Sequence, residues 1–121
     1  MYIKFLKSKL QGLTVTAKNL YYTGSIKLDK NFLDLANIQP YEIVLVINLS
    51  NGERFETYVI PAKKGSKIVA LQGGAARLGE LGDQLIIMSF WYKEIKNSNI
   101  KQEKPVKIIF NRNNTIRKII K

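Results

Sequence analysis

Hydrophobic and polar residues alternate with a period of two over several short segments of this chain. Leu13, Val15 and Ala17 alternate within residues 9–17, which predicts a strand. Segments rich in β-branched and aromatic residues predict further strands, namely 41–50, 54–60, 66–71, 84–92, 105–110 and 115–120. Because the last two flank the polar residues 111–114, we expect a final hairpin. Many short strands with turn residues between them favour a mainly β fold, a small β-barrel with short helices.

Residues 28–38 are the best candidate for a helix. Asp29 is suited to cap its N-terminus, and we expect Pro40 to close it. Its expected apolar face consists of Phe32, Leu33, Leu35 and Ala36. Residues 72–83 predict a turn of small residues with a short helical piece.

Asn51-Gly52 separates two of the predicted strands. Asn-Gly between two such segments is the strongest short hairpin signal, because the type I′ turn needs positive φ at both positions. We therefore predict a type I′ hairpin here.

The composition limits the class of protein. The chain has 121 residues, of which 45 % are hydrophobic and 24 % charged, which fits a single globular domain, 1–121. No apolar segment approaches the length of a membrane span, and the N-terminus is a poor secretory signal, so we expect a cytoplasmic protein without a membrane partner. Cysteine and histidine are both absent. This removes the thiol nucleophile, the usual general base and the commonest metal ligands, so we expect no metal site.

The formal net charge of +11 raises the question of a nucleic-acid partner. The basic residues are scattered, and the densest segment, 112–121, lacks the repeated basic and aromatic residues on which bases stack. We therefore favour a lysine-rich solvated surface over a nucleic-acid groove.

Gly24-Ser25 interrupts a segment with strand character, residues 19–29. One interpretation is a tight bend, since Gly and Ser are common in turns. The other is chemical, because a serine hydroxyl can attack the preceding carbonyl in a strained bend. Glycine suits the upstream position because it has no Cβ and can adopt unusual backbone angles. The resulting ester can lose its acyl group by β-elimination, and hydrolysis of the dehydroalanine then leaves a pyruvoyl group.

Three motifs carry a resemblance to a known family. They are Tyr-x-Gly-Ser at 22–25, Asn-Gly-x-Arg-Phe-x-Thr-Tyr at 51–58 and Gly-x-Ala-Ala at 73–76. Over residues 1–92 the chain resembles the pyruvoyl-dependent aspartate 1-decarboxylases, bacterial enzymes that make β-alanine for pantothenate biosynthesis, whereas the last thirty residues or so add little. The resemblance implies a double-psi β-barrel, a homotetramer with sites between subunits, and self-cleavage into a β chain, 1–24, and an α chain, 25–121.

The resemblance also implies the roles of individual residues. Ser25 becomes the pyruvoyl cofactor, with which the amine of L-aspartate forms a Schiff base, and Tyr58 protonates the intermediate. Thr57 and Gln72 would assist cleavage after Gly24. Regular pairing turns neighbouring side chains to opposite faces, so Thr57 and Tyr58 would both reach the site only through a local twist or bulge. The remaining substrate-binding residues implied are Lys9, Tyr22, Arg54, Thr57, Gly73, Gly74, Ala75 and Ile86.

Two positions depart from the family pattern. Many relatives have histidine at the position of Gln11 and asparagine at that of Gln72. The glutamine amide stands one methylene further from the backbone than that of asparagine, so we predict slower cleavage than is usual in the family. The +11 charge is not required by the chemistry, although it would concentrate a dianionic substrate. Two alternatives remain open: a basic β-barrel that binds nucleic acid, and an uncleaved, non-catalytic relative.

Overall fold

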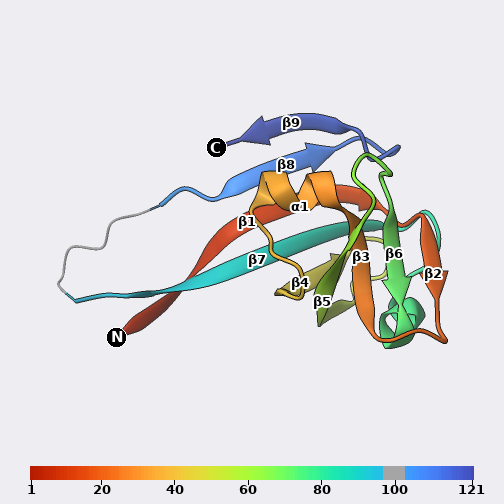
Figure 1. The fold of residues 1–121 in the computed structure, drawn as a ribbon, viewed down its shortest axis with the longest axis horizontal. Helices are drawn as coiled ribbons and strands as arrows, with labels where there is room; N and C mark the ends of the chain where they lie inside the picture. The colour runs from red at the N-terminus through yellow and green to blue at the C-terminus, as the bar shows by residue number, and fades with distance from the viewer. Residues whose placement is uncertain (97–102) are drawn as a thin grey trace.

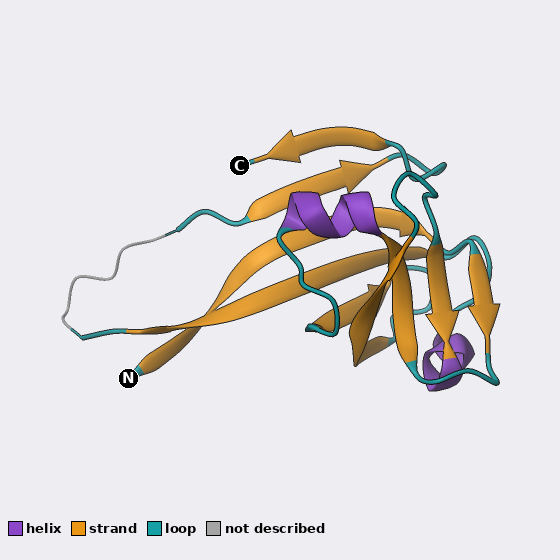
Figure 2. Ribbon diagram, in the orientation of Figure 1, coloured by secondary structure: helices purple, strands orange, loops and turns teal. Residues whose placement is uncertain are grey.

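The computed structural model describes residues 1–96 and 103–121, which form nine strands and two short helices (Figure 2). The strands are β1 (Tyr2–Thr14), β2 (Ala17–Asn19), β3 (Ser25–Asp29), β4 (Ile43–Asn48), β5 (Arg54–Ala62), β6 (Val69–Gln72), β7 (Gln84–Glu94), β8 (Val106–Phe110) and β9 (Ile116–Ile120). The helices are α1 (Lys30–Ala36) and the 3₁₀ helix η1 (Gly73–Leu78). The prediction of a mainly β fold with short helices is confirmed.

The strands pair in the order β2-β6-β3-β5-β4-β7-β1-β8-β9. The pairs β1/β8, β2/β6 and β3/β5 are parallel, and the other pairs are antiparallel. Figure 1 shows β1 and β7 as a long ribbon, with β3, β5 and β6 gathered at one end. In the described residues this series runs from β2 to β9 without a pair that joins its ends, so closure into a double-psi barrel stays a prediction.

The core lies between the inner face of the sheet and α1. Its largest fully buried side chains are Leu10, Leu13, Ile26, Leu28, Leu33, Leu71, Leu85, Ile87, Ile108, Val44, Val46 and Val59. The ring of Phe32 packs edge-on against that of Phe110, with centroids 4.8 Å apart, which joins α1 to β8. Leu35 is 37 % exposed, so its expected place on the apolar face is wrong; Phe32, Leu33 and Ala36 form that face.

The ends of α1 follow from its capping residues. The Asp29 carboxylate accepts a hydrogen bond from the Asn31 N–H at 2.8 Å, which confirms the expected N-cap. The helix begins at Lys30 rather than residue 28 because the preceding residues belong to β3. It ends at Ala36, since Asn37 adopts the left-handed conformation with φ 57°, so the expectation that Pro40 closes it is wrong.

Two predicted strands differ from the observed ones by three residues or more at one end or both, whereas the others differ by one or two residues. The segment 9–17 divides into β1 and β2, because the N–H groups of Val15 and Thr16 leave the strand and donate to the carbonyls of Asp83 and Val69. The strand expected at 66–71 begins later, at Val69, because Lys67 has a φ of 59°. Its other end extends to Gln72, which we had expected in a turn.

Both predicted hairpins form, as β4–β5 and β8–β9. The type I′ turn is wrong, since Gly52 has a positive φ of 79° and Asn51 does not. Residues 49–53 instead form a longer connection, in which the Gly52 N–H donates to the Asn48 carbonyl. No helix in the described residues is both long and apolar enough to cross a membrane.

Candidate active site

Ser25 is the first residue of β3 and is fully buried. Its Cα pairs with that of Gln72 across the antiparallel β3/β6 ladder, which turns both side chains to one face. The Ser25 hydroxyl donates a hydrogen bond to the Gln72 Oε1 at 2.8 Å. The glutamine amide therefore reaches the hydroxyl that the sequence identified as the nucleophile, and holds it in a site from which bulk water is excluded.

Gly73 packs directly against the segment that precedes Ser25. Its φ is +66°, and a Cβ built on it would lie 2.6 Å from the Gly24 Cα and 2.6 Å from the Tyr22 carbonyl oxygen. Only glycine fits this close approach. Gly24 has neither a left-handed φ nor a neighbour within 4 Å of a built Cβ, so the unusual backbone that we expected at Gly24 lies at Gly73 instead.

Helix η1 is anchored at its far end by β4. The buried Asn48 side chain donates to the Leu78 carbonyl at 3.1 Å and to the Asp83 carboxylate at 2.9 Å. The hydrogen bond from Asn48 is the largest cause that lowers the pKa of Asp83, with a second contribution from the Glu80 backbone N–H. Helix η1, which begins with Gly73, is therefore held by β6 at its start and by the Asn48 hydrogen bonds at its end.

Tyr58 lies level with Ser25 on the neighbouring strand. The parallel β3/β5 ladder pairs Ile26 with Val59, so the preceding residues, Ser25 and Tyr58, lie beside each other. Tyr58 stacks on Tyr41, with ring centroids 6.2 Å apart. These contacts put a phenol on the strand beside the Ser25 backbone.

Thr57 and Tyr58 belong to a regular part of the β4/β5 ladder. Their partners are Val44, which is 1 % exposed, and Ile43, which is 55 % exposed. Thr57 therefore faces the core and Tyr58 the outside, with no bulge between them. The twist that would bring both side chains to one face of the strand is absent from this part of the described chain.

Arg54, Ile86 and Gln11 lie in one row across the outer face of the sheet. The row follows from three successive pairs, Arg54–Ile47, Ile47–Ile86 and Ile86–Gln11. The next row on the same face consists of Glu56, Leu45, Met88 and Lys9. We refer to these eight residues as the outer face.

The outer face has charged ends and an apolar centre. Leu45, Ile47, Ile86 and Met88 are each partly exposed. Arg54 stands at one side of this apolar strip and Lys9 at the other, and among the described residues neither takes part in an ion pair. The sequence analysis missed the strip, although it follows from counting every second residue along β4 and β7 from a paired position.

The predicted residues thus fall into two groups. The first group, which we call the processing pocket, consists of Gly24, Ser25, Gln72 and Gly73. Ala75, which is 8 % exposed, lies nearby in η1. Tyr22 and Gly74 flank it and are exposed. Arg54 and Tyr58 are four residues apart on β5, which corresponds to about 13 Å of extended strand. Lys9 lies on β1, three strands away from β5 across the sheet. One chain therefore does not bring Lys9 or Arg54 to its own Ser25.

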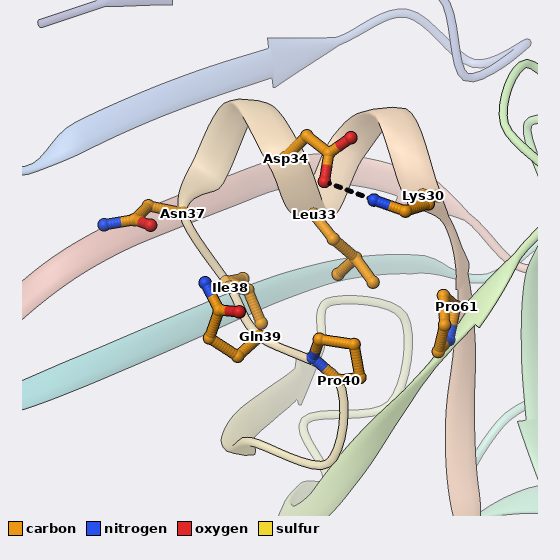
Figure 3. A pocket seen from close by; sticks show the side chains of 8 residues that line it. All are labelled: Lys30, Leu33, Asp34, Asn37, Ile38, Gln39, Pro40 and Pro61. Atoms are coloured by element: carbon orange, nitrogen blue, oxygen red, sulfur yellow. Dashed lines mark hydrogen bonds and ion pairs between the residues drawn. The ribbon is translucent and has the colours of Figure 1, made fainter.

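A pocket of about 240 Å³ lies elsewhere, beside α1 (Figure 3). Its walls come from α1, residues 37–40 and Pro61, and the Lys30 ammonium donates to the Asp34 carboxylate at its rim. The pKa of Asp34 is lowered, chiefly by this hydrogen bond. None of the predicted site residues lines this pocket.

Comparison with known proteins identifies the family of this chain. The model of a family described as aspartate decarboxylase matches residues 1–117, well beyond the first 92 residues in which we found the resemblance. Aspartate 1-decarboxylase of Clostridium novyi is 44 % identical over 98 % of this chain and 95 % of its own length. The enzyme of Clostridium botulinum is 47 % identical over 94 % and 89 %, and that of Coxiella burnetii is 52 % identical over 74 % and 81 %. The chain belongs to the aspartate decarboxylase family.

Proposed function

We propose that this protein is a self-processing aspartate 1-decarboxylase, which converts L-aspartate to β-alanine and CO₂ and so supplies pantothenate biosynthesis in the cytoplasm. One observation carries the proposal. The Ser25 hydroxyl is buried and hydrogen-bonded to Gln72, beside a glycine whose missing Cβ leaves room for the Gly24 backbone. The proposed cleavage begins with attack by this hydroxyl on the carbonyl of Gly24, the residue directly before it.

Processing would begin at the Gly24-Ser25 peptide bond. The Ser25 Oγ forms a bond to the Gly24 carbonyl carbon, the C–N bond breaks, and the hydroxyl proton passes to the Ser25 nitrogen. Loss of the Ser25 α-proton and cleavage of the Cβ–Oγ bond then release the Gly24 carboxylate and leave dehydroalanine. Water then hydrolyses the dehydroalanine, so that its amino nitrogen leaves as ammonia and a ketone remains. The products are a β chain, 1–24, and an α chain, 25–121, which begins with a pyruvoyl group.

The processing pocket fits a pyruvoyl group at position 25. Gly73 and Ala75 are small residues close to it, and Gln72 is in reach of its oxygen. The pyruvoyl carbonyl supplies an electrophile for the substrate amine and a sink for the electrons released with CO₂. Tyr58, level with residue 25, is the proton donor in this proposal, since a phenol can give a proton to carbon when no histidine is present.

The outer face would bind the carboxylates of aspartate. The planar guanidinium of Arg54 can hold the retained carboxylate through two hydrogen bonds, and Lys9 can contact the other. Ile86 would form an apolar wall, next to which the departing carboxylate is poorly solvated. Because Arg54 and Lys9 are remote from Ser25 in one chain, the proposal requires the outer face of a second copy to cover the processing pocket. A homotetramer with sites between subunits would meet this requirement and would also bury the apolar strip.

Intact-mass measurement tests the proposal. Freshly purified protein should give two fragments that separate after Gly24, the larger of which reacts with hydroxylamine and releases CO₂ from aspartate. Ser25→Ala should give one uncut, inactive chain, whereas the control Ser50→Ala, in the exposed β4–β5 connection, should be cleaved normally. A wild-type chain that stays whole after prolonged warming, without turnover, would contradict the proposal. If that chain also bound RNA or DNA with strong salt dependence, it would be a nucleic-acid module.

A further inference from the structure

The C-terminal hairpin extends the outer face beyond Lys9. In the parallel β1/β8 ladder Lys9 pairs with Lys107, and the next pair, Leu10 with Ile108, is fully buried. Since side chains alternate between the two faces of a sheet, Lys9 and Lys107 both point outward. Their Cα atoms belong to adjacent strands and lie about 5 Å apart.

Within the described residues, Lys9 and Lys107 have no carboxylate partner, as most lysines of this basic chain have none. Lys7, Lys18 and Lys30 are each ion-paired, with Glu42, Glu80 and Asp34 respectively. Within residues 1–96 and 103–121, no ion pair includes Lys9 or Lys107. Like charges on directly paired residues of a sheet are destabilising. These two lysines occupy directly paired positions of the sheet and have no ion pair in the described part of the chain, so an anion that contacts both ammonium groups would relieve their repulsion.

We propose that Lys107 is a further carboxylate-binding residue, which acts with Lys9 on one carboxylate of a dicarboxylic amino acid. The proposal rests on the proposed function, because Lys9 serves the substrate only if the outer face does. Two ammonium groups at one end of the apolar strip, opposite the single guanidinium of Arg54, match a substrate with a carboxylate at each end. Lys107 thereby favours dicarboxylates over monocarboxylic amino acids.

The test uses three variants of the full chain. Lys107→Gln removes the ammonium group, Lys107→Arg keeps the charge, and Lys63→Gln removes an equal charge from the exposed β5–β6 loop. For each we would measure KM and kcat for aspartate, and the calorimetric Kd of succinate, a dicarboxylate that has no amine to react. Both would be measured at about 0.05 M and about 0.3 M salt, since remote charges are screened at the higher concentration.

We expect Lys107→Gln to raise KM for aspartate and Kd for succinate about threefold to tenfold at both salt concentrations. Lys107→Arg should stay near wild type, and so should Lys63→Gln. The proposal is overturned if Lys107→Gln matches Lys63→Gln, if its effect disappears at the higher salt concentration, or if only kcat changes. If wild type releases no CO₂ from aspartate, the proposed function fails, and the succinate titration still decides whether Lys107 binds a carboxylate.

Discussion

The processing pocket and the outer face differ in how the chain holds their side chains. In the processing pocket, the Ser25 hydroxyl is hydrogen-bonded to Gln72, and Gly73 packs against the backbone of Gly24. On the outer face, Lys9 and Arg54 have no ion-pair partner among the described residues. The first region is organised within one chain, as the proposed intramolecular cleavage would require. The second is left open, as the proposed binding of a substrate and of another subunit would require.

The largest effect should come from Gly73→Ala. The new Cβ would lie 2.6 Å from the Gly24 Cα, and alanine disfavours a φ of +66°. We expect the segment before Ser25 to shift and self-cleavage to slow more than about a hundredfold, because misplacement by an ångström is enough to cost that much. The measurement is the rate of appearance of the two fragments by mass spectrometry.

Gly74→Ala is the matched control for this prediction, since a Cβ at Gly74 meets nothing within 4 Å. It should be cleaved at the wild-type rate. Equal cleavage of the Gly73 and Gly74 variants would mean that the close approach at Gly73 has no role in processing.

Arg54→Ala should affect the outer face alone. Removal of a charged hydrogen bond costs about 1.5–3 kcal/mol, so kcat/KM for aspartate should fall about tenfold to a hundredfold. Fragment formation should remain normal, because Arg54 lies about 13 Å along β5 from the level of Ser25. Steady-state kinetics on fully cleaved protein checks the first expectation, and slower cleavage of the variant would contradict the separation of the two regions.

Gln72→Asn should have a moderate effect of the opposite sign. In wild type the Ser25 hydroxyl donates to the Gln72 amide oxygen at 2.8 Å. The glutamine amide stands one methylene further from the backbone than that of asparagine, so asparagine would hold the hydroxyl closer to the position that is usual in the family, and we expect cleavage to be a few times faster. A variant that cleaves no faster than wild type would disprove the prediction that glutamine at position 72 slows cleavage.

Asp83→Asn should have the smallest effect, one that depends on pH. The pKa of Asp83 is lowered in the folded protein from its ordinary value of 3.8. The Asp83 carboxylate therefore stabilises the folded state at pH values above 3.8. This contribution is lost as the pH falls through the lowered folded value. Asp83→Asn should therefore reduce Tm near neutral pH and become equal to wild type in acid, while Glu53→Gln, an exposed control, should show no such trend. A pH-independent difference in Tm would rule out this role of the charge.

The sequence predicts the strands well where hydrophobic residues alternate, and less well where the backbone leaves the ladder. The β4–β5 and β8–β9 hairpins form as expected from turn residues between apolar segments. The division of residues 9–17 was not predictable, because it depends on hydrogen bonds to Asp83 and Val69, which are remote in the chain. The sequence does not predict the helix end at Asn37, because an asparagine that adopts the left-handed conformation is a weaker signal in sequence than the proline at position 40.

The candidate site also depends on contacts between segments that are remote in the chain, which the sequence does not predict. The resemblance points to Ser25, Gln72 and Gly73, but it does not indicate that the close backbone approach occurs at Gly73 rather than Gly24. No local pattern joins Arg54, Ile47, Ile86 and Gln11, because their common row results from the pairing of four strands. Lys107 lies in the segment where the resemblance was weakest, and only the parallel pairing of β8 with β1 brings it beside Lys9.

The most direct test of the account is the intact mass of freshly purified wild-type protein beside its Ser25→Ala variant. We predict two fragments from wild type, divided after Gly24, with a hydroxylamine-reactive ketone at the start of the second, and a single chain from the variant. A wild-type protein that remains a single chain, or a Ser25→Ala chain that is cut at the same place, would contradict the central claim that this serine hydroxyl breaks its own peptide bond.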